Sequence, residues 1–147
     1  MLIHNYKFNQ MKSEQLDGYW ILENRVENPI PENYFEVGDK FYVVKSIYIE
    51  ILCFNTAENK CYQLGINSLP NQAGTSSLFE MSAFLPGSYN LEEMTLEFLD
   101  EGIMSFIDEK LLVKVKTTDY ECDEIWKRLT GENKDLVEFL DIEMKNN

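Results

Sequence analysis

The sequence predicts a mainly β fold of the α+β class, an antiparallel barrel or sandwich of eight or nine strands followed by C-terminal helices. Three observations predict it. Between residues 19 and 117, short segments rich in β-branched and aromatic residues alternate with turn residues. After residue 117 the apolar residues recur at helical spacing. The length of 147 residues suits a single domain, with an irregular lead over 1–15, a barrel over 16–117 and a helical segment over 118–147.

The early strands are separated by prolines and glycines. The first, 19–26, ends before Pro29 and Pro31, and the next two flank Gly38-Asp39, a hairpin or bulge signal. The full set of expected strands is 19–26, 34–37, 40–44, 47–54, 60–66, 78–85, 94–99, 102–107 and 111–117.

The segment 47–54 shows the clearest alternation in the chain. Ile49, Ile51 and Cys53 share one face, and we expect Glu50 on the outer face of the strand. If the loop 55–59 joins a regular hairpin, Cys53 faces Cys61 directly. That pair is either a redox sensor or two small core thiols, and we favour core thiols.

The later strands form a meander. A long loop-like stretch over 67–77 precedes the strand 78–85, and Pro86-Gly87 is a turn dipeptide. Turns of two or three residues then connect the last three strands.

The C-terminal part changes period. Thr118 to Glu121 has the form of a capping box, and the apolar residues after it recur at helical spacing until Gly131. A second helix is expected over 133–145. The competing interpretation makes 125–129 a last strand, because alternation also fits so short a segment.

The charge is strongly negative, with 26 Asp and Glu against 13 Lys and Arg and a formal net charge of −13. Nucleic-acid binding and docking on an anionic membrane both need clustered Lys and Arg, so neither is expected. A basic protein partner is electrostatically plausible, although a negative surface also serves solubility. The start of the chain lacks a secretory signal, no apolar run is long enough to span a membrane, and the three cysteines lack CxxC spacing. We therefore expect a cytoplasmic protein.

Signatures of catalysis are missing from the sequence. His4 is the sole histidine, and no phosphate-binding, dinucleotide-binding or nucleophile-elbow motif occurs. We expect no metal, no cofactor and no enzymatic activity, with carboxylate-only catalysis as the formal exception.

The best candidate for a functional surface is an acidic stretch without Lys or Arg. It contains Glu92, Glu93, Glu97, Asp100, Glu101, Asp108 and Glu109. A second cluster follows at Asp119, Glu121, Asp123 and Glu124. Such a face would steer a basic protein toward it. A row of ordinary solvated turns is the alternative.

The segment Leu16-Asp17-Gly18-Tyr19-Trp20 resembles the LxGxW start of the lipocalin-like (calycin) β-barrels. In that superfamily the Trp packs across the closed end of the barrel beside an Arg or Lys from near the last strand. Trp20 and Arg128 would hold these places here, with Gly18 as the motif glycine. The resemblance covers about residues 14–130 and implies a barrel with, in many relatives, a small hydrophobic ligand. Lipocalins proper are usually secreted and disulfide-bonded. This chain departs from them, because we expect it to be cytosolic.

Two functions are therefore expected from the sequence. The first is a non-enzymatic immunity or inhibitor protein that neutralises a basic toxin, such as a nuclease domain. Its contacts would come from Glu97, Asp100, Glu101, Asp108, Glu109 and Tyr120. The second is a lipocalin-like carrier that holds a small hydrophobic ligand inside the barrel.

Overall fold

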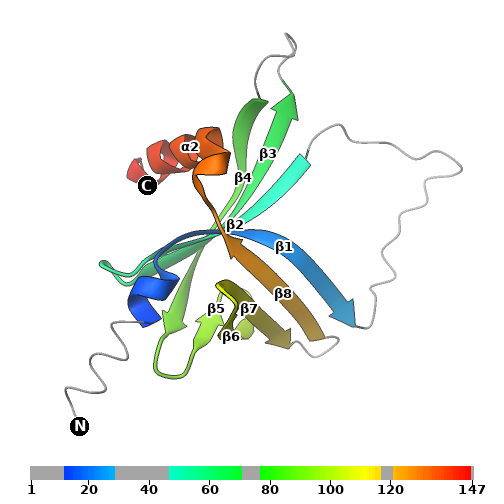
Figure 1. Ribbon diagram of the computed structural model, residues 1–147, viewed down its shortest axis with the longest axis vertical. Helices are drawn as coiled ribbons and strands as arrows, with labels where there is room; N and C mark the ends of the chain where they lie inside the picture. Colours follow the sequence, from blue (N-terminus) through cyan, green and yellow to red (C-terminus); the bar gives the residue numbers. More distant parts are fainter. Residues whose placement is uncertain (1–11, 29–46, 71–76, 117–120, 147) are drawn as a thin grey trace, which may run out of the picture.

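The structure is a closed antiparallel β-barrel with a C-terminal helix (Figure 1). This computed structural model describes residues 12–28, 47–70, 77–116 and 121–146. Within them the strands are β1 (Gly18–Asn28), β2 (Ile47–Asn55), β3 (Lys60–Pro70), β4 (Ser77–Asn90), β5 (Thr95–Glu97), β6 (Glu101–Ile107), β7 (Lys110–Lys116) and β8 (Glu121–Arg128). Each strand pairs with the next along the chain, and β8 pairs with β1 to close the barrel. The predicted mainly β class is confirmed.

The strand β8 corrects the helix expected directly after residue 117. It pairs with β7 through Lys116↔Glu121 and with β1 through Trp20↔Arg128. The helical spacing of its apolar residues was misleading because, in a segment this short, the same residues also fit a strand. The backbone ladders on both sides decide the outcome. The barrel therefore extends to residue 128 rather than to 117.

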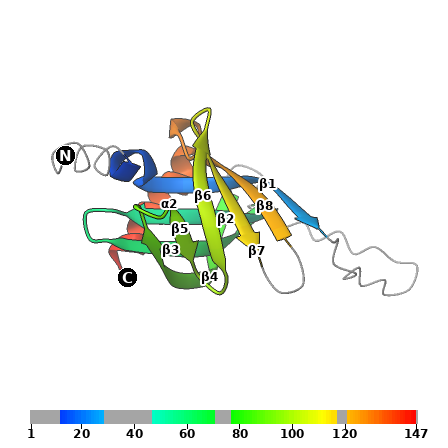
Figure 2. The same cartoon turned by 90° about the horizontal axis from the view of Figure 1, so that it is seen from below.

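The helical part begins after the barrel. A 3₁₀ turn, η1 (Gly131–Asn133), leads into α2 (Lys134–Lys145), which confirms the helix expected over 133–145. A short helix over 12–16 also precedes β1 (Figure 2). No helix in the described ranges is long and apolar enough to cross a membrane.

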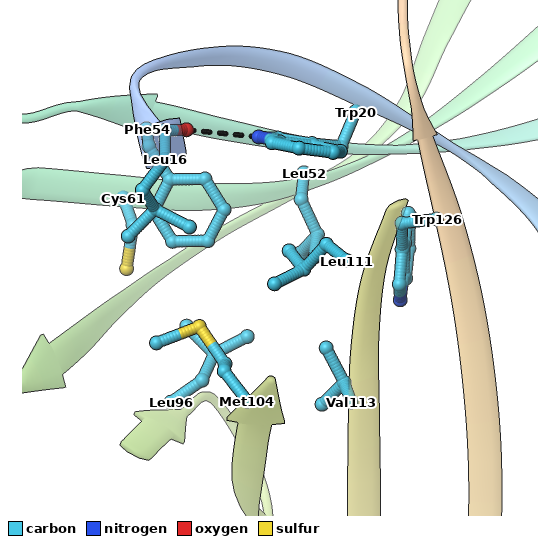
Figure 3. Packing of buried hydrophobic residues seen from close by; sticks show 10 residues of the cluster. All are labelled: Leu16, Trp20, Leu52, Phe54, Cys61, Leu96, Met104, Leu111, Val113 and Trp126. Atoms are coloured by element: carbon cyan, nitrogen blue, oxygen red, sulfur yellow. Dashed lines mark hydrogen bonds between the residues drawn. The ribbon is translucent and has the colours of Figure 1, made fainter. Parts of the chain in front are cut away.

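The apolar residues form two cores, one inside the barrel and one outside it. The inner core is filled by Leu16, Trp20, Leu52, Phe54, Cys61, Leu96, Met104, Leu111, Val113 and Trp126 (Figure 3). The outer core lies between α2 and the sheet, where Leu136 and Leu140 pack against Ile51, Cys53, Leu64 and Ile66 (Figure 1). Tyr19 fixes the helix further by donating a hydrogen bond of 2.7 Å to Asp141 Oδ1.

The two cores reverse the predicted facing of β2. Its Ile49, Ile51 and Cys53 face outward to the helix, whereas Leu52 and Phe54 face the interior. Side chains at every second residue of a strand lie on the same face, so Glu50 points inward with Leu52 and Phe54. Its predicted place on the outer face is therefore wrong. Both faces of this strand are covered, and the alternation alone could not show which face is the interior.

The β2–β3 hairpin also differs in register from the expected one. Phe54 pairs with Cys61, and Cys53 pairs with Tyr62, because the turn is one residue shorter than predicted. A shift of one residue moves a side chain to the opposite face. Cys53 consequently lies in the outer core and Cys61 in the inner core, and none of the three cysteines forms a disulfide.

Two other turn predictions also differ or fall outside the described residues. Pro86-Gly87 lies within β4 rather than in a turn. Pro86 pairs with Tyr62 of β3, whereas the pairing of β4 with β5 covers only Ser88 to Asn90, so Pro86 has no ladder partner on the β5 side. The loop expected over 67–77 is shorter, since β3 continues to Pro70. The expected strands 34–37 and 40–44 lie outside the described residues.

Candidate functional site

The two ends of the barrel are built differently. At one end, called the closed end here, Trp20 is 2% exposed, and its indole N–H donates a hydrogen bond of 2.8 Å to the Leu16 carbonyl (Figure 3). The guanidinium of Arg128 lies 4.3 Å from the Trp20 ring centroid. Arg128 also donates to the carbonyl oxygen of Gln15, in the last turn of the short helix, and to that of Asp17, directly after it. The cation thus stacks on the tryptophan and neutralises the carbonyl end of that helix.

Gly18 is required at this end for two reasons. Its φ of +110° is a conformation that residues with a side chain rarely adopt. A Cβ atom at this position would also lie 3.2 Å from an Arg128 nitrogen. The three residues of the predicted motif, Gly18, Trp20 and Arg128, are therefore brought together in space.

The opposite end, called the open end here, contains a cavity of about 260 Å³ in the barrel interior. Its apolar wall is formed by Leu52, Leu96, Phe98, Leu99, Val113, Val115, Cys122 and Trp126. Its polar lining consists of Arg25, Gln63, Asp100 and Glu124. The cavity therefore combines apolar side chains with convergent polar groups, as small-molecule sites do.

A three-residue ion cluster lies at this open end and joins three strands. Arg25 from β1 contacts Glu50 from β2 and Glu124 from β8, each at 2.7 Å. All three guanidinium nitrogens of Arg25 contact a carboxylate oxygen. The Trp126 indole N–H adds a hydrogen bond of 3.3 Å to Glu124. The side chains of Glu50 and Glu124 are only 18% and 11% exposed, so this is a partly buried network rather than a surface pair.

The electrostatics of the cluster leave a surplus of negative charge. Burial alone would lower the pKa of Arg25, but its hydrogen bond to Glu50 and the charges of Glu124 and Glu50 raise it overall. Arg25 therefore stays protonated. One positive charge faces two carboxylates, and Asp100 adds a third carboxylate to the cavity wall.

Sequence reasoning missed Arg25 because a β-bulge lies between Leu22 and Asn24. Simple alternation from Trp20 would place Leu22 and Asn24 inside and Arg25 outside. The extra residue reverses the parity, so that Arg25 pairs with Glu124 and points inward. The sequence carries no signal for this bulge. The one usable hint was an acid, Glu50, in the middle of an apolar strand.

The predicted partner-binding acids are exposed but do not form one face. Glu97, Asp100 and Glu101 lie around the β5–β6 turn at the open end. Asp108 and Glu109 form the β6–β7 turn, about 20 Å away along β6. Tyr120 lies outside the described residues.

The second acidic cluster is largely compensated. Glu121 and Asp123 pair across the sheet with Lys116 and Lys114, at 3.7 and 3.9 Å. Glu124 points inward to Arg25. By contrast, none of the ion pairs found in the described residues involves Glu97, Asp100 or Glu101.

The turn at Asp108 and Glu109 has a costly backbone conformation. Their φ values are +49° and +66°, the left-handed pair that a two-residue hairpin of type I′ needs. Asn-Gly is the preferred sequence for such a turn. A broader hollow of about 760 Å³ lies beside it, against Trp20 and Arg128. Its lining combines charged side chains with the rings of Trp20 and Phe106, and most of these residues are exposed, whereas most residues that line the open-end cavity are buried or half-buried.

Other chemistry is not assembled in the described part of the chain, where no group of three His, Cys, Asp or Glu residues could hold a metal ion. His4 lies outside the described residues. Burial raises the pKa of the Cys53 thiol to about 12 and that of Cys61 to about 11. Neither thiol is therefore suited to nucleophilic chemistry at neutral pH. In comparisons with protein families, curated proteins and solved structures, nothing matches this chain.

Proposed function

We propose that this protein is a binding protein, without catalytic activity, that holds a small and mainly apolar ligand in the open-end cavity. The observation that carries the proposal is the cavity itself, whose wall is formed by inward-facing residues of the barrel, including Leu52, Val113 and Trp126. Its volume of about 260 Å³ lies just below the roughly 300–1,000 Å³ of sites for drug-sized molecules. The ligand is accordingly a small one.

The closed end supports a place among the lipocalin-like barrels. Trp20 under Arg128, with Gly18 beside them, is the arrangement that the resemblance implies. We propose membership of that superfamily on these contacts and on the closed antiparallel barrel. We also propose a reducing compartment, the cytosol, because all three cysteines are buried thiols without a disulfide.

The two tryptophans allow a direct test of ligand binding. Trp126 lines the cavity, whereas the Trp20 indole is engaged at the closed end. Titration with 1-hexanol should shift the Trp126 indole N–H signal in an NMR spectrum and leave that of Trp20 in place. Equal shifts at both indoles, or none at Trp126, would count against the proposal.

A pair of substitutions then locates the bound molecule. Val115→Phe should fill the cavity and abolish the shift at Trp126. Ile103→Phe is the matched control, because Ile103 is 60% exposed on the outside of β6. Binding that survives Val115→Phe would place the ligand elsewhere.

A second candidate function is recognition of a basic protein by the acidic open end. We propose it because Glu97, Asp100 and Glu101 are exposed together beside Leu99, which is 85% exposed. An apolar residue ringed by acids suits a basic partner, such as the toxin that an immunity protein neutralises.

The separation of the two acidic turns makes this second candidate testable. A basic partner captured from a lysate of the host should dissociate as salt rises. Reversing Glu97, Asp100 and Glu101 to Lys should slow its association by at least about tenfold. Reversing Asp108 and Glu109 should have a much smaller effect. Equal effects of the two sets of substitutions would show that the open end is not the binding surface.

A further inference from the structure

We propose that the open-end cavity selects a small organic cation, an amine with an apolar body, over neutral or anionic molecules of the same size. This inference rests on the proposed ligand-binding function and names the ligand class. It follows from three properties of the cavity: which charges line it, which of them are already neutralised, and what the remaining wall is made of.

The first step is that the single base of the lining cannot recruit an anion. Arg25 is the one Lys or Arg among the described residues that line the cavity. Its three nitrogens already contact Glu50 and Glu124, so a ligand carboxylate would have to displace one of these partners. It would then also face the displaced carboxylate in a partly buried site, which is unfavourable.

The second step is that the carboxylates, unlike Arg25, keep negative charge that no partner neutralises. Glu124 and Asp100 line the cavity itself. Glu50 does not line it but contacts Arg25, so the single positive charge of Arg25 is shared between Glu50 and Glu124. A carboxylate accepts more hydrogen bonds than these contacts use. An ammonium group supplies both the missing positive charge and up to three donors.

The third step concerns the apolar part of the ligand. Phe98 and Trp126 contribute aromatic rings to the wall, and Leu96 and Val113 contribute aliphatic groups. Aromatic faces attract cations, and aliphatic walls bind an alkyl chain through the hydrophobic effect. The Trp126 indole donates to Glu124, so the aromatic wall and the acidic group are in direct contact.

The test compares three ligands of equal chain length that differ only in charge: hexylammonium, 1-hexanol and hexanoate. Each is titrated into the full chain at neutral pH and low salt, with the Trp126 indole N–H signal as the readout. We expect hexylammonium to bind at least about tenfold more tightly than hexanoate, with 1-hexanol in between. Added salt should weaken the binding of hexylammonium and leave that of 1-hexanol unchanged.

Glu50→Gln tests the origin of this preference. It removes the surplus charge of the cluster and keeps the Arg25–Glu124 pair, so the advantage of hexylammonium over 1-hexanol should fall at least about threefold. Glu138→Gln, at an exposed position on α2, is the matched control and should change nothing. If Glu50→Gln does not fold, the salt dependence in the unchanged protein gives the same decision.

The outcomes separate this inference from the proposed function. If 1-hexanol binds but hexylammonium binds no better than hexanoate, the charge preference is wrong and the ligand-binding barrel stands. If none of the three ligands shifts the Trp126 signal, the proposed function fails and the inference fails with it.

Discussion

Replacing Arg25 with Met should destabilise the fold by about 2–3 kcal/mol, because it leaves Glu50 and Glu124 facing each other without a counter-ion. Removing one partner of a fully buried ion pair typically costs about 3–5 kcal/mol. Glu50 and Glu124 retain 18% and 11% exposure, which lets water offset part of that cost. For a chain of this length the loss corresponds to a decrease in Tm of roughly 5–10 °C.

Urea denaturation followed by tryptophan fluorescence measures this loss. Combining Arg25→Met with Glu50→Gln and Glu124→Gln should recover more than half of the lost stability. Lys114→Met is the control, since its pair with Asp123 is exposed at 3.9 Å and contributes little. A loss within about 0.5 kcal/mol for Arg25→Met would refute the account of the cluster.

Three further predictions concern the rest of the barrel. Arg128→Met should cost about 1–2 kcal/mol in urea denaturation, because it removes the cation over Trp20 and two hydrogen bonds to carbonyl oxygens; an unchanged midpoint would contradict the role given to Arg128. Glu109→Gly should stabilise the fold by about 1 kcal/mol, since Glu109 has a φ of +66°, and a lower Tm would show that the turn is not strained. Above pH 8.5 the unfolded chain releases thiol protons that Cys53 and Cys61 keep in the folded state, because burial raises the pKa of these thiols to about 12 and about 11. The free energy of unfolding should therefore be unaffected by these thiols below about pH 8.5 and fall as pH rises from about 8.5 toward 11, by about 1 kcal/mol per thiol per pH unit. Urea titrations under reducing conditions check this, and the curve of a Cys53→Ala, Cys61→Ala double variant should be flatter over the same range.

The predicted strands show how far local pattern carries. Alternation and turn residues were sufficient for β2, β6 and β7, whose cores match the expected segments within a few residues. They were insufficient for β8, where the apolar residues fit either period. The choice there depends on β1 and β7, which are distant in sequence and supply the backbone partners.

The closed end was predictable from sequence in a way that the open end was not. Gly18, Trp20 and Arg128 belong to a recognisable pattern, and each has a distinctive chemical role. Arg25 and Glu124 belong to no pattern. They meet because one extra residue in β1 reverses the facing of the strand, and no local propensity marks that residue.

The sequence by itself determined the class of the fold, the helix near the C-terminus, the negative charge and the motif at the closed end. These properties depend on composition and on spacing between near neighbours, which the chain carries whatever its tertiary structure. Only the tertiary structure decided which face of β2 is the interior, which register joins it to β3, and which acids are paired. Those properties depend on contacts between distant strands, where a shift of one residue moves a side chain from the cavity to the surface.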